Sequence, residues 1–195
     1  MSPDPASAAG PSGFWLALPV GWVSFDVDPS TSLASARQRI AVAAERDDIV
    51  AANRDALERI LVGAARQAAE GGVVYCAAYF ESFRDYAVQA SLAVSFHAAE
   101  HGADFGRMLQ ELQDTDRSLE VVQLEAGRAV KRSGRRHTRF PGTEVPLELI
   151  THQFFIPVPG TADLMAVVAF ASPTLALEPD LIALFDAIAE GFAFT

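Results

Sequence analysis

The chain has 195 residues, of which 50% are hydrophobic and 21% are charged. This length can bury a sizeable core, and the composition is typical of a globular protein and excludes an intrinsically disordered one. The formal net charge of −10 disfavours binding to nucleic acid or to an anionic membrane surface. The single cysteine, Cys76, excludes an intrachain disulfide and a multi-cysteine metal site.

Residues 1–13 are small and rich in Pro and Gly, so we expect a flexible N-terminal segment followed by a single α+β domain, residues 14–195. This segment lacks the basic region and the apolar stretch of a signal peptide. The chain has no run of about 18 apolar residues that could span a bilayer. We therefore expect a cytoplasmic protein without membrane insertion.

The first half of the domain is predicted to begin with two short strands, at residues 14–18 and 22–28, around a Pro and a Gly. Residues 33–70 are rich in Ala and Arg and predict two helices, which end at a pair of glycines. An apolar run at 73–80 and an alternating run at 86–97 predict two further strands.

The second half is predicted to begin with a short helix at residues 103–113 and a strand at 119–124, after which Gly127 permits a bend. Residues 133–142 are polar and basic, which indicates an exposed loop or hairpin tip. Two extended runs, at 147–157 and 164–170, are joined by Gly/Pro turn chemistry and predict a hairpin. Apolar residues then recur at helical spacing, with a proline suited to the first turn. These apolar positions are Leu181, Leu184, Phe185, Ile188 and Phe192.

Two short stretches resemble a known family. The opening Trp15-Leu16-Ala17-Leu18-Pro19-Val20-Gly21-Trp22 is similar to the strand, Pro, Gly-Trp start of the PsbP/LpqN-like family. Val121-Val122-Gln123-Leu124-Glu125-Ala126-Gly127-Arg128-Ala129-Val130 resembles a hairpin of actinobacterial proteins of the same build. The resemblance extends over nearly the whole chain from Trp15. It implies an antiparallel β-sheet flanked by helices, an α/β/α sandwich, in a family that mostly binds partners and has no common catalytic residues.

One stretch of twelve residues is strongly basic and contains no acid, although the chain as a whole is acidic. Its charged members are Arg128, Lys131, Arg132, Arg135, Arg136 and Arg139. They indicate a docking surface for an acidic partner segment or a phosphate-bearing ligand. The alternative is a solvated hairpin whose arginines pair with acidic residues of the chain, each pair contributing little. Nucleic acid is disfavoured, because no aromatic residues are interleaved for base stacking.

Other chemistry-bearing residues have simpler interpretations. His97-Ala98-Ala99-Glu100-His101 matches the order of an inverted zinc-peptidase motif, but it follows a predicted strand, so we assign no metal. Cys76 lies in an apolar run and is expected to be a small buried hydrophobe. His152 alternates with apolar neighbours and is expected to be a hydrogen-bonded or edge histidine. Asp26 and Asp28 are expected on the solvent face of a strand.

The sequence therefore predicts a non-catalytic binding or accessory protein without a cofactor, such as a chaperone-like or secretion-system accessory factor. It would hold a protein partner through its sheet face or through the basic stretch. Two alternatives stay open. One is a small ligand-binding domain or enzyme with a pocket between helices and sheet, lined by Tyr75, Tyr79, His97 and Asp26. The other is a metalloprotein using His97 and His101. Whether the chain forms a homodimer is also open.

Overall fold

The computed structural model describes residues 11–25, 71–82, 87–98, 119–139, 145–161 and 163–195, together with Val27 and isolated positions between 34 and 70. The predicted helices at 33–70 and 103–113 thus lie outside the described residues, apart from those isolated positions. The elements found in the described part are β1 (Phe14–Trp15), β2 (Trp22–Phe25), β3 (Val73–Ser82), β4 (Ala87–Ala98), β5 (Leu119–Leu124), β6 (Gly127–Arg139), β7 (Pro146–Pro157), β8 (Leu164–Ser172), the short 3₁₀ helix η1 (Leu175–Leu177), α5 (Glu178–Glu190) and β9 (Ala193–Phe194).

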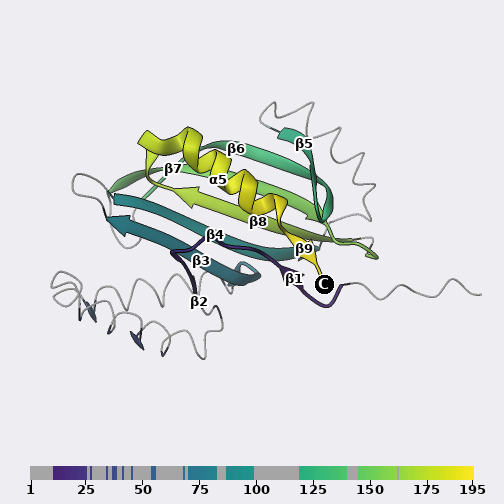
Figure 1. Cartoon of the computed structure of the whole chain (residues 1–195), viewed down its shortest axis with the longest axis horizontal. Coiled ribbons are helices and arrows are strands. Elements are labelled where there is room, and N and C mark those ends of the chain that lie inside the picture. Colours follow the sequence, from purple (N-terminus) through teal and green to yellow (C-terminus); the bar gives the residue numbers. More distant parts are fainter. Residues whose placement is uncertain are drawn as a thin grey trace, which may run out of the picture.

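Seven of these strands form one antiparallel sheet in the order β2-β3-β4-β8-β7-β6-β5. β8 lies between β4 and β7, so the final hairpin joins the two halves of the sheet. β1 and β9 pair with each other in a separate two-stranded sheet, which brings the two ends of the domain together. α5 lies across one face of the large sheet (Figure 1). No helix in the described part of the chain is both long and apolar enough to cross a membrane.

The hairpin predicted from residues 147–157 and 164–170 is confirmed as β7 and β8. Its turn is closed by two backbone hydrogen bonds, in which Val158 N donates to Leu164 O at 3.0 Å and Thr161 N donates to Val158 O at 3.3 Å. Gly160 has a φ of 76°, a conformation that costs little only for glycine. The turn sequence therefore sets the register of the two central strands.

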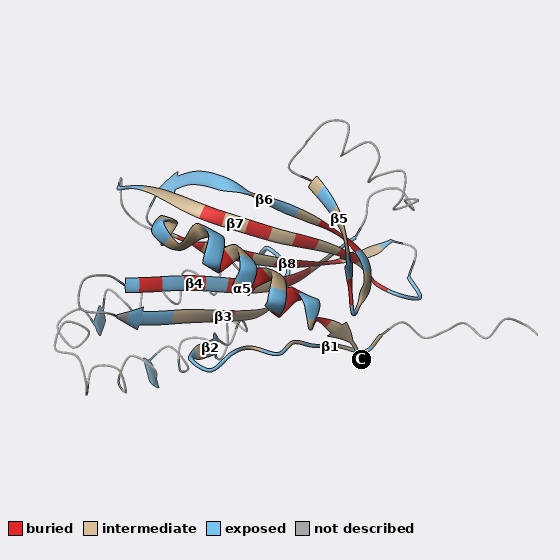
Figure 2. Ribbon diagram, turned by 45° about the horizontal axis from the view of Figure 1, so that its top comes forward, coloured by how far each residue is buried: buried red, intermediate tan, exposed pale blue. Residues whose placement is uncertain are grey.

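The core lies between the sheet and α5, as the distribution of buried residues in Figure 2 shows. Phe185 of α5 stacks on Phe170 of β8, with ring centroids 4.7 Å apart, and Phe154 of β7 meets Phe170 edge-on at 6.2 Å. All three rings are at most 1% exposed. α5 begins where it was predicted, with a proline in its first turn beside Glu178 and Asp180, whose charges suit the positive end of the helix dipole.

One expectation about the architecture is wrong, and a second is supported only in part. Residues 133–139, expected to form a loop or hairpin tip, continue β6 as a strand that pairs with β7 as far as Arg139↔Pro146. Their polar sequence lacks apolar alternation because the strand is exposed here, while its backbone is still held by β7. The fold is α+β and mostly antiparallel sheet with one C-terminal helix, and within the described residues a helix covers only one of the two sheet faces.

The aromatic contacts between α5 and the sheet predict where the stability of the fold is concentrated. Phe185→Ala should lower the free energy of unfolding by about 3–5 kcal/mol, since it removes a fully buried ring and leaves a cavity. Phe80→Ala is the matched control because Phe80 is 63% exposed, and it should change stability by less than about 0.5 kcal/mol. Urea denaturation measures both, and equal effects would contradict this account of the core.

Candidate functional site

The six basic residues of the predicted docking surface lie on β6, and the alternation of the strand divides them into two rows. Lys131, Arg135 and Arg139 lie on the face that α5 covers. Arg128, Arg132 and Arg136 lie on the opposite face. The basic stretch in the sequence is therefore two separate rows of charge.

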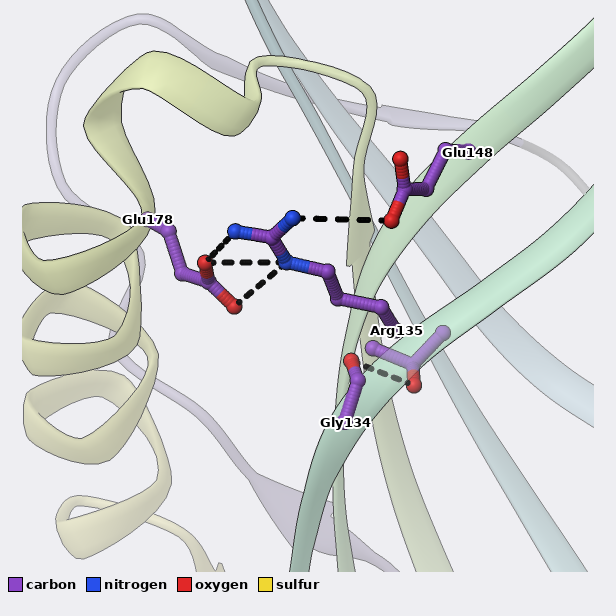
Figure 3. A network of polar contacts seen from close by, with 5 residues as sticks. Gly134, Arg135, Glu148 and Glu178 are labelled. Carbon is purple, nitrogen blue, oxygen red and sulfur yellow. Dashed lines mark hydrogen bonds and ion pairs between the residues drawn. The ribbon is translucent and has the colours of Figure 1, made fainter.

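The row on the α5 face is largely neutralised inside the chain. Figure 3 shows the Arg135 guanidinium between Glu178 of α5 and Glu148 of β7. Its Nε and Nη2 donate to Glu178 Oε2 at 3.1 and 2.5 Å, and its Nη1 lies 3.5 Å from Glu148 Oε1. The pair with Glu178 raises the pKa of Arg135 and lowers that of Glu178. Lys131 is similarly engaged, with Nζ 3.1 Å from Glu120 Oε2 and 3.4 Å from Asp186 Oδ1.

The row on the opposite face is open to solvent. Arg128 and Arg136 are exposed, and neither forms an ion pair with another residue in the described part of the chain. Arg132 of the same row is also exposed, and it has an interaction within the chain, as does Arg139 on the α5 face. A partner could therefore meet Arg128 and Arg136 without first breaking an internal ion pair.

Within the described residues, β6 extends beyond the end of β5, so part of its backbone pairs with a strand on one side only. The pairing with β5 ends at Leu119↔Arg132, whereas the pairing with β7 continues to Arg139↔Pro146. Residues 133–139 thus pair on one side only within the described residues, and Figure 2 shows this part of β6 as largely exposed. We call it the open edge. Unpaired N–H and C=O groups at a sheet edge form a template for another strand.

A buried histidine lies directly behind the start of the open edge. The side chain of His152 on β7 is 0% exposed. Its Nδ1 is 2.7 Å from Ser133 Oγ on β6, and its Nε2 is 2.9 Å from Asp186 Oδ1 on α5. A carboxylate can only accept a hydrogen bond, so Nε2 carries the proton and Nδ1 accepts from the Ser133 hydroxyl.

The surroundings of His152 hold its ring in the neutral form. Burial lowers its pKa below the ordinary value, and this outweighs the opposing effect of Asp186. Lys131, which forms an ion pair with the Asp186 carboxylate, lowers the pKa of His152 further, whereas Glu120 raises it. The rings of Phe154 and Phe185 pack against the imidazole at 4.9 and 6.3 Å and keep water from it.

The sequence did not predict this side-chain cluster. Ser133 falls in residues 133–142, which were expected to form a loop or hairpin tip, and no local pattern distinguishes Asp186. The expectation that His152 is hydrogen-bonded is confirmed, but it is not an edge residue, because β7 lies between β6 and β8. The hydrogen-bonded side chains are separated by 19 and 34 positions along the chain, so no local motif could reveal them.

The residues proposed from the sequence to line a pocket do not come together. Tyr75 and Tyr79 on β3 lie on the α5 side of the sheet and pack against the core, whereas His97 lies on the opposite side. Asp26, like its neighbour Asp28, falls outside the described residues. His97 ends a strand, as expected, and its Nε2 lies 2.7 Å from Ser95 Oγ. Residues 99–101 of the zinc-like motif fall outside the described residues. Among the residues that are described, no group of three or more His, Cys, Asp or Glu could hold a metal ion.

Cys76 lies on the sheet face opposite α5 and is half-buried, less enclosed than its apolar run predicted. Burial raises the pKa of its thiol. The thiolate is thus disfavoured, and Cys76 has the character of a packing residue.

Comparison with known proteins finds a weak similarity to a solved structure. No protein-family model matches the chain, and no curated protein sequence matches it. The crystal structure of LpqN, involved in cell envelope biogenesis of Mycobacterium tuberculosis, is similar with a TM-score of 0.46 and 11% sequence identity. The similarity covers 96% of this chain and 87% of that chain. Membership of the PsbP/LpqN-like family stays a prediction.

The buried histidine predicts a specific dependence of stability on pH. Because the pKa of His152 is lowered on folding, the unfolded chain binds a proton that the folded chain does not. The stability is complete above about pH 6.5 and should be lost as the pH falls through the lowered pKa, at up to about 1.4 kcal/mol per pH unit. His152→Gln keeps a polar group but cannot titrate, so it should remove this slope.

Urea denaturation of both proteins at pH 7, 6 and 5 tests the prediction. The other histidines and the carboxylates are common to both, so their contributions cancel in the difference. A variant slope equal to that of the wild type would show that His152 is not the group responsible.

Proposed function

We propose that this chain is a binding or accessory protein that holds an acidic, extended segment of a partner protein as an added strand along the open edge of β6. The observation that carries the proposal is that residues 133–139 of β6 pair with β7 alone among the described residues, and that residues 134–139 are exposed. Strand addition at an exposed sheet edge is a recurring way of binding extended peptides.

The backbone of the open edge would supply the affinity, because main-chain hydrogen bonds form with any non-proline sequence. Such binding tolerates many partner side chains. It suits a chaperone-like or secretion-system accessory factor, which has to hold segments of differing sequence.

The charge on β6 would select the partner. Arg136 is exposed on the open edge without an internal ion pair in the described part; Arg132 precedes it in the same row, and Arg139 follows it on the α5 face. An acidic segment would meet attraction at this strand, while the net charge of −10 would repel it elsewhere. Electrostatic complementarity of this kind contributes mainly to the specificity and rate of association.

The same arginines argue against a second copy of the chain as the occupant. Two open edges paired with each other would place arginines of one copy against arginines of the other. Like charges that face each other across strands are destabilising. Basic side chains on an edge strand thus prevent self-association and still admit a partner of opposite charge.

The proposal predicts that charge reversal at the open edge weakens binding more than charge reversal elsewhere on β6. The probe is a seven-residue peptide with alternating Glu and Val, capped at both ends and followed by fluorescence anisotropy. Arg136→Glu should weaken binding about tenfold, as an exposed attraction becomes a repulsion. Arg128→Glu is the matched control, because Arg128 lies in the same row but pairs with Gln123 of β5, outside the open edge. It should weaken binding less.

A second probe separates strand addition from simple charge attraction. The same peptide with N-methyl groups on alternate backbone nitrogens keeps its charge but cannot complete a ladder of hydrogen bonds. It should bind much more weakly than the unmethylated peptide. Equal binding of both peptides, or equal effects of the two Arg variants, would reject the open edge as the docking site.

A further inference from the structure

Ser133, His152 and Asp186 form a hydroxyl, imidazole and carboxylate series that the proposed binding function does not use. The three side chains come from β6, β7 and α5 and are joined by hydrogen bonds of 2.7 and 2.9 Å. This is the order in which serine hydrolases arrange a nucleophile, a general base and the carboxylate that orients the base.

The direction of each hydrogen bond follows from the chemistry of the groups. Asp186 accepts from Nε2–H, so Nδ1 is unprotonated and faces the Ser133 hydroxyl. The two ring nitrogens are exchanged relative to the usual serine-protease arrangement. The proton transfer is unaffected, because either nitrogen of a neutral imidazole can act as the base.

The two reacting groups differ in exposure in a way that suits this role. His152 is fully buried, whereas Ser133 is only half-buried. Among the described residues, Ser133 is also the first residue of β6 beyond its pairing with β5. A small electrophile could approach the exposed part of Ser133 while the base stays buried, which strengthens its electrostatic interactions.

The same chain contains a comparison pair that lacks two of these features. Ser95 Oγ and His97 Nε2 on β4 also lie 2.7 Å apart. His97, however, is exposed, and no carboxylate of the described residues bonds to its ring. The burial of the His152 ring and its hydrogen bond to the Asp186 carboxylate therefore distinguish Ser133 from a serine that merely contacts a histidine.

We propose that Ser133 is an activated nucleophile that takes the acyl group of small carboxylic esters, with His152 as general base and Asp186 as the positioning residue. The proposal does not rest on the proposed binding function.

Ser133 Oγ forms a bond to the carbonyl carbon as its proton moves to His152 Nδ1. The ester C–O bond then breaks, and the departing alcohol oxygen takes that proton from Nδ1. Water next adds to the acyl carbon and gives a proton to Nδ1, the bond to Oγ breaks, and the carboxylic acid leaves as Oγ regains its proton.

The test is covalent labelling of the folded full chain with a fluorophosphonate, in which the serine oxygen bonds to phosphorus and fluoride leaves. Peptide mapping by mass spectrometry should place the label on Ser133 and not on Ser95. p-Nitrophenyl acetate should likewise leave an acetyl group on Ser133. This comparison within one protein needs no variant, so a folding defect cannot obscure it.

Variants test the roles of the other two side chains. Ser133→Ala should abolish the label, and His152→Gln should slow labelling at least about 100-fold, the usual contribution of a general base. Asp186→Asn should slow labelling and move its pH midpoint to lower pH, because the carboxylate raises the pKa of His152. Ser95→Ala is the control and should label like the wild type, and a thermal melt confirms that each variant is folded.

Labelling of Ser133 no faster than Ser95 in the folded wild type would overturn the proposal, as would an unchanged rate in folded His152→Gln. In either case the series would serve only to satisfy the buried ring of His152. Binding of the acidic peptide is measured separately, so failure of one proposal leaves the other standing.

Discussion

The packing of Phe185 against Phe170 is the contact on which the arrangement of the rest depends. Burying this ring determines how α5 is rotated about its axis, and the residue after Phe185 must then point toward the rim of the helix–sheet interface. That residue is Asp186, which bonds to His152 and Lys131. The packing of Phe185 thereby places Asp186 over β6 and β7, which carry Lys131 and His152. Glu178, at the start of the same helix, meets Arg135 in the same way.

β6 combines two different environments along one strand. Its first half pairs with β5 and, from Val130 onward, also with β7, and it carries Ala129 and Val130, which are almost completely buried. Its second half is exposed and paired only with β7 in the described part of the chain. Ser133 lies at the transition between the halves. The proposed docking edge and the proposed nucleophile both depend on the same feature, namely that β6 extends beyond β5 in the described part of the chain.

Much of the fold could be predicted from local patterns. The hairpin of β7 and β8 and the helix α5 were predicted within a few residues of their observed bounds, because they combine clear periodicity with Gly/Pro punctuation. The prediction failed at residues 133–139, whose polar sequence indicates a loop. A strand forms there because β7 supplies hydrogen-bond partners from more distant positions in the chain, and local propensity contains no information about them.

The sequence by itself determined the α+β class of the fold, most of the strands, the C-terminal helix and the presence of a basic stretch. These features depend on composition and on patterns within a few residues. Only the tertiary structure decided that the basic stretch is divided between two faces, that Arg135 and Lys131 are neutralised by acids of other elements, and that Ser133, His152 and Asp186 are in contact. The physical reason is that hydrogen bonds and ion pairs depend on distance in space, and the sheet and α5 bring together side chains that the sequence keeps far apart.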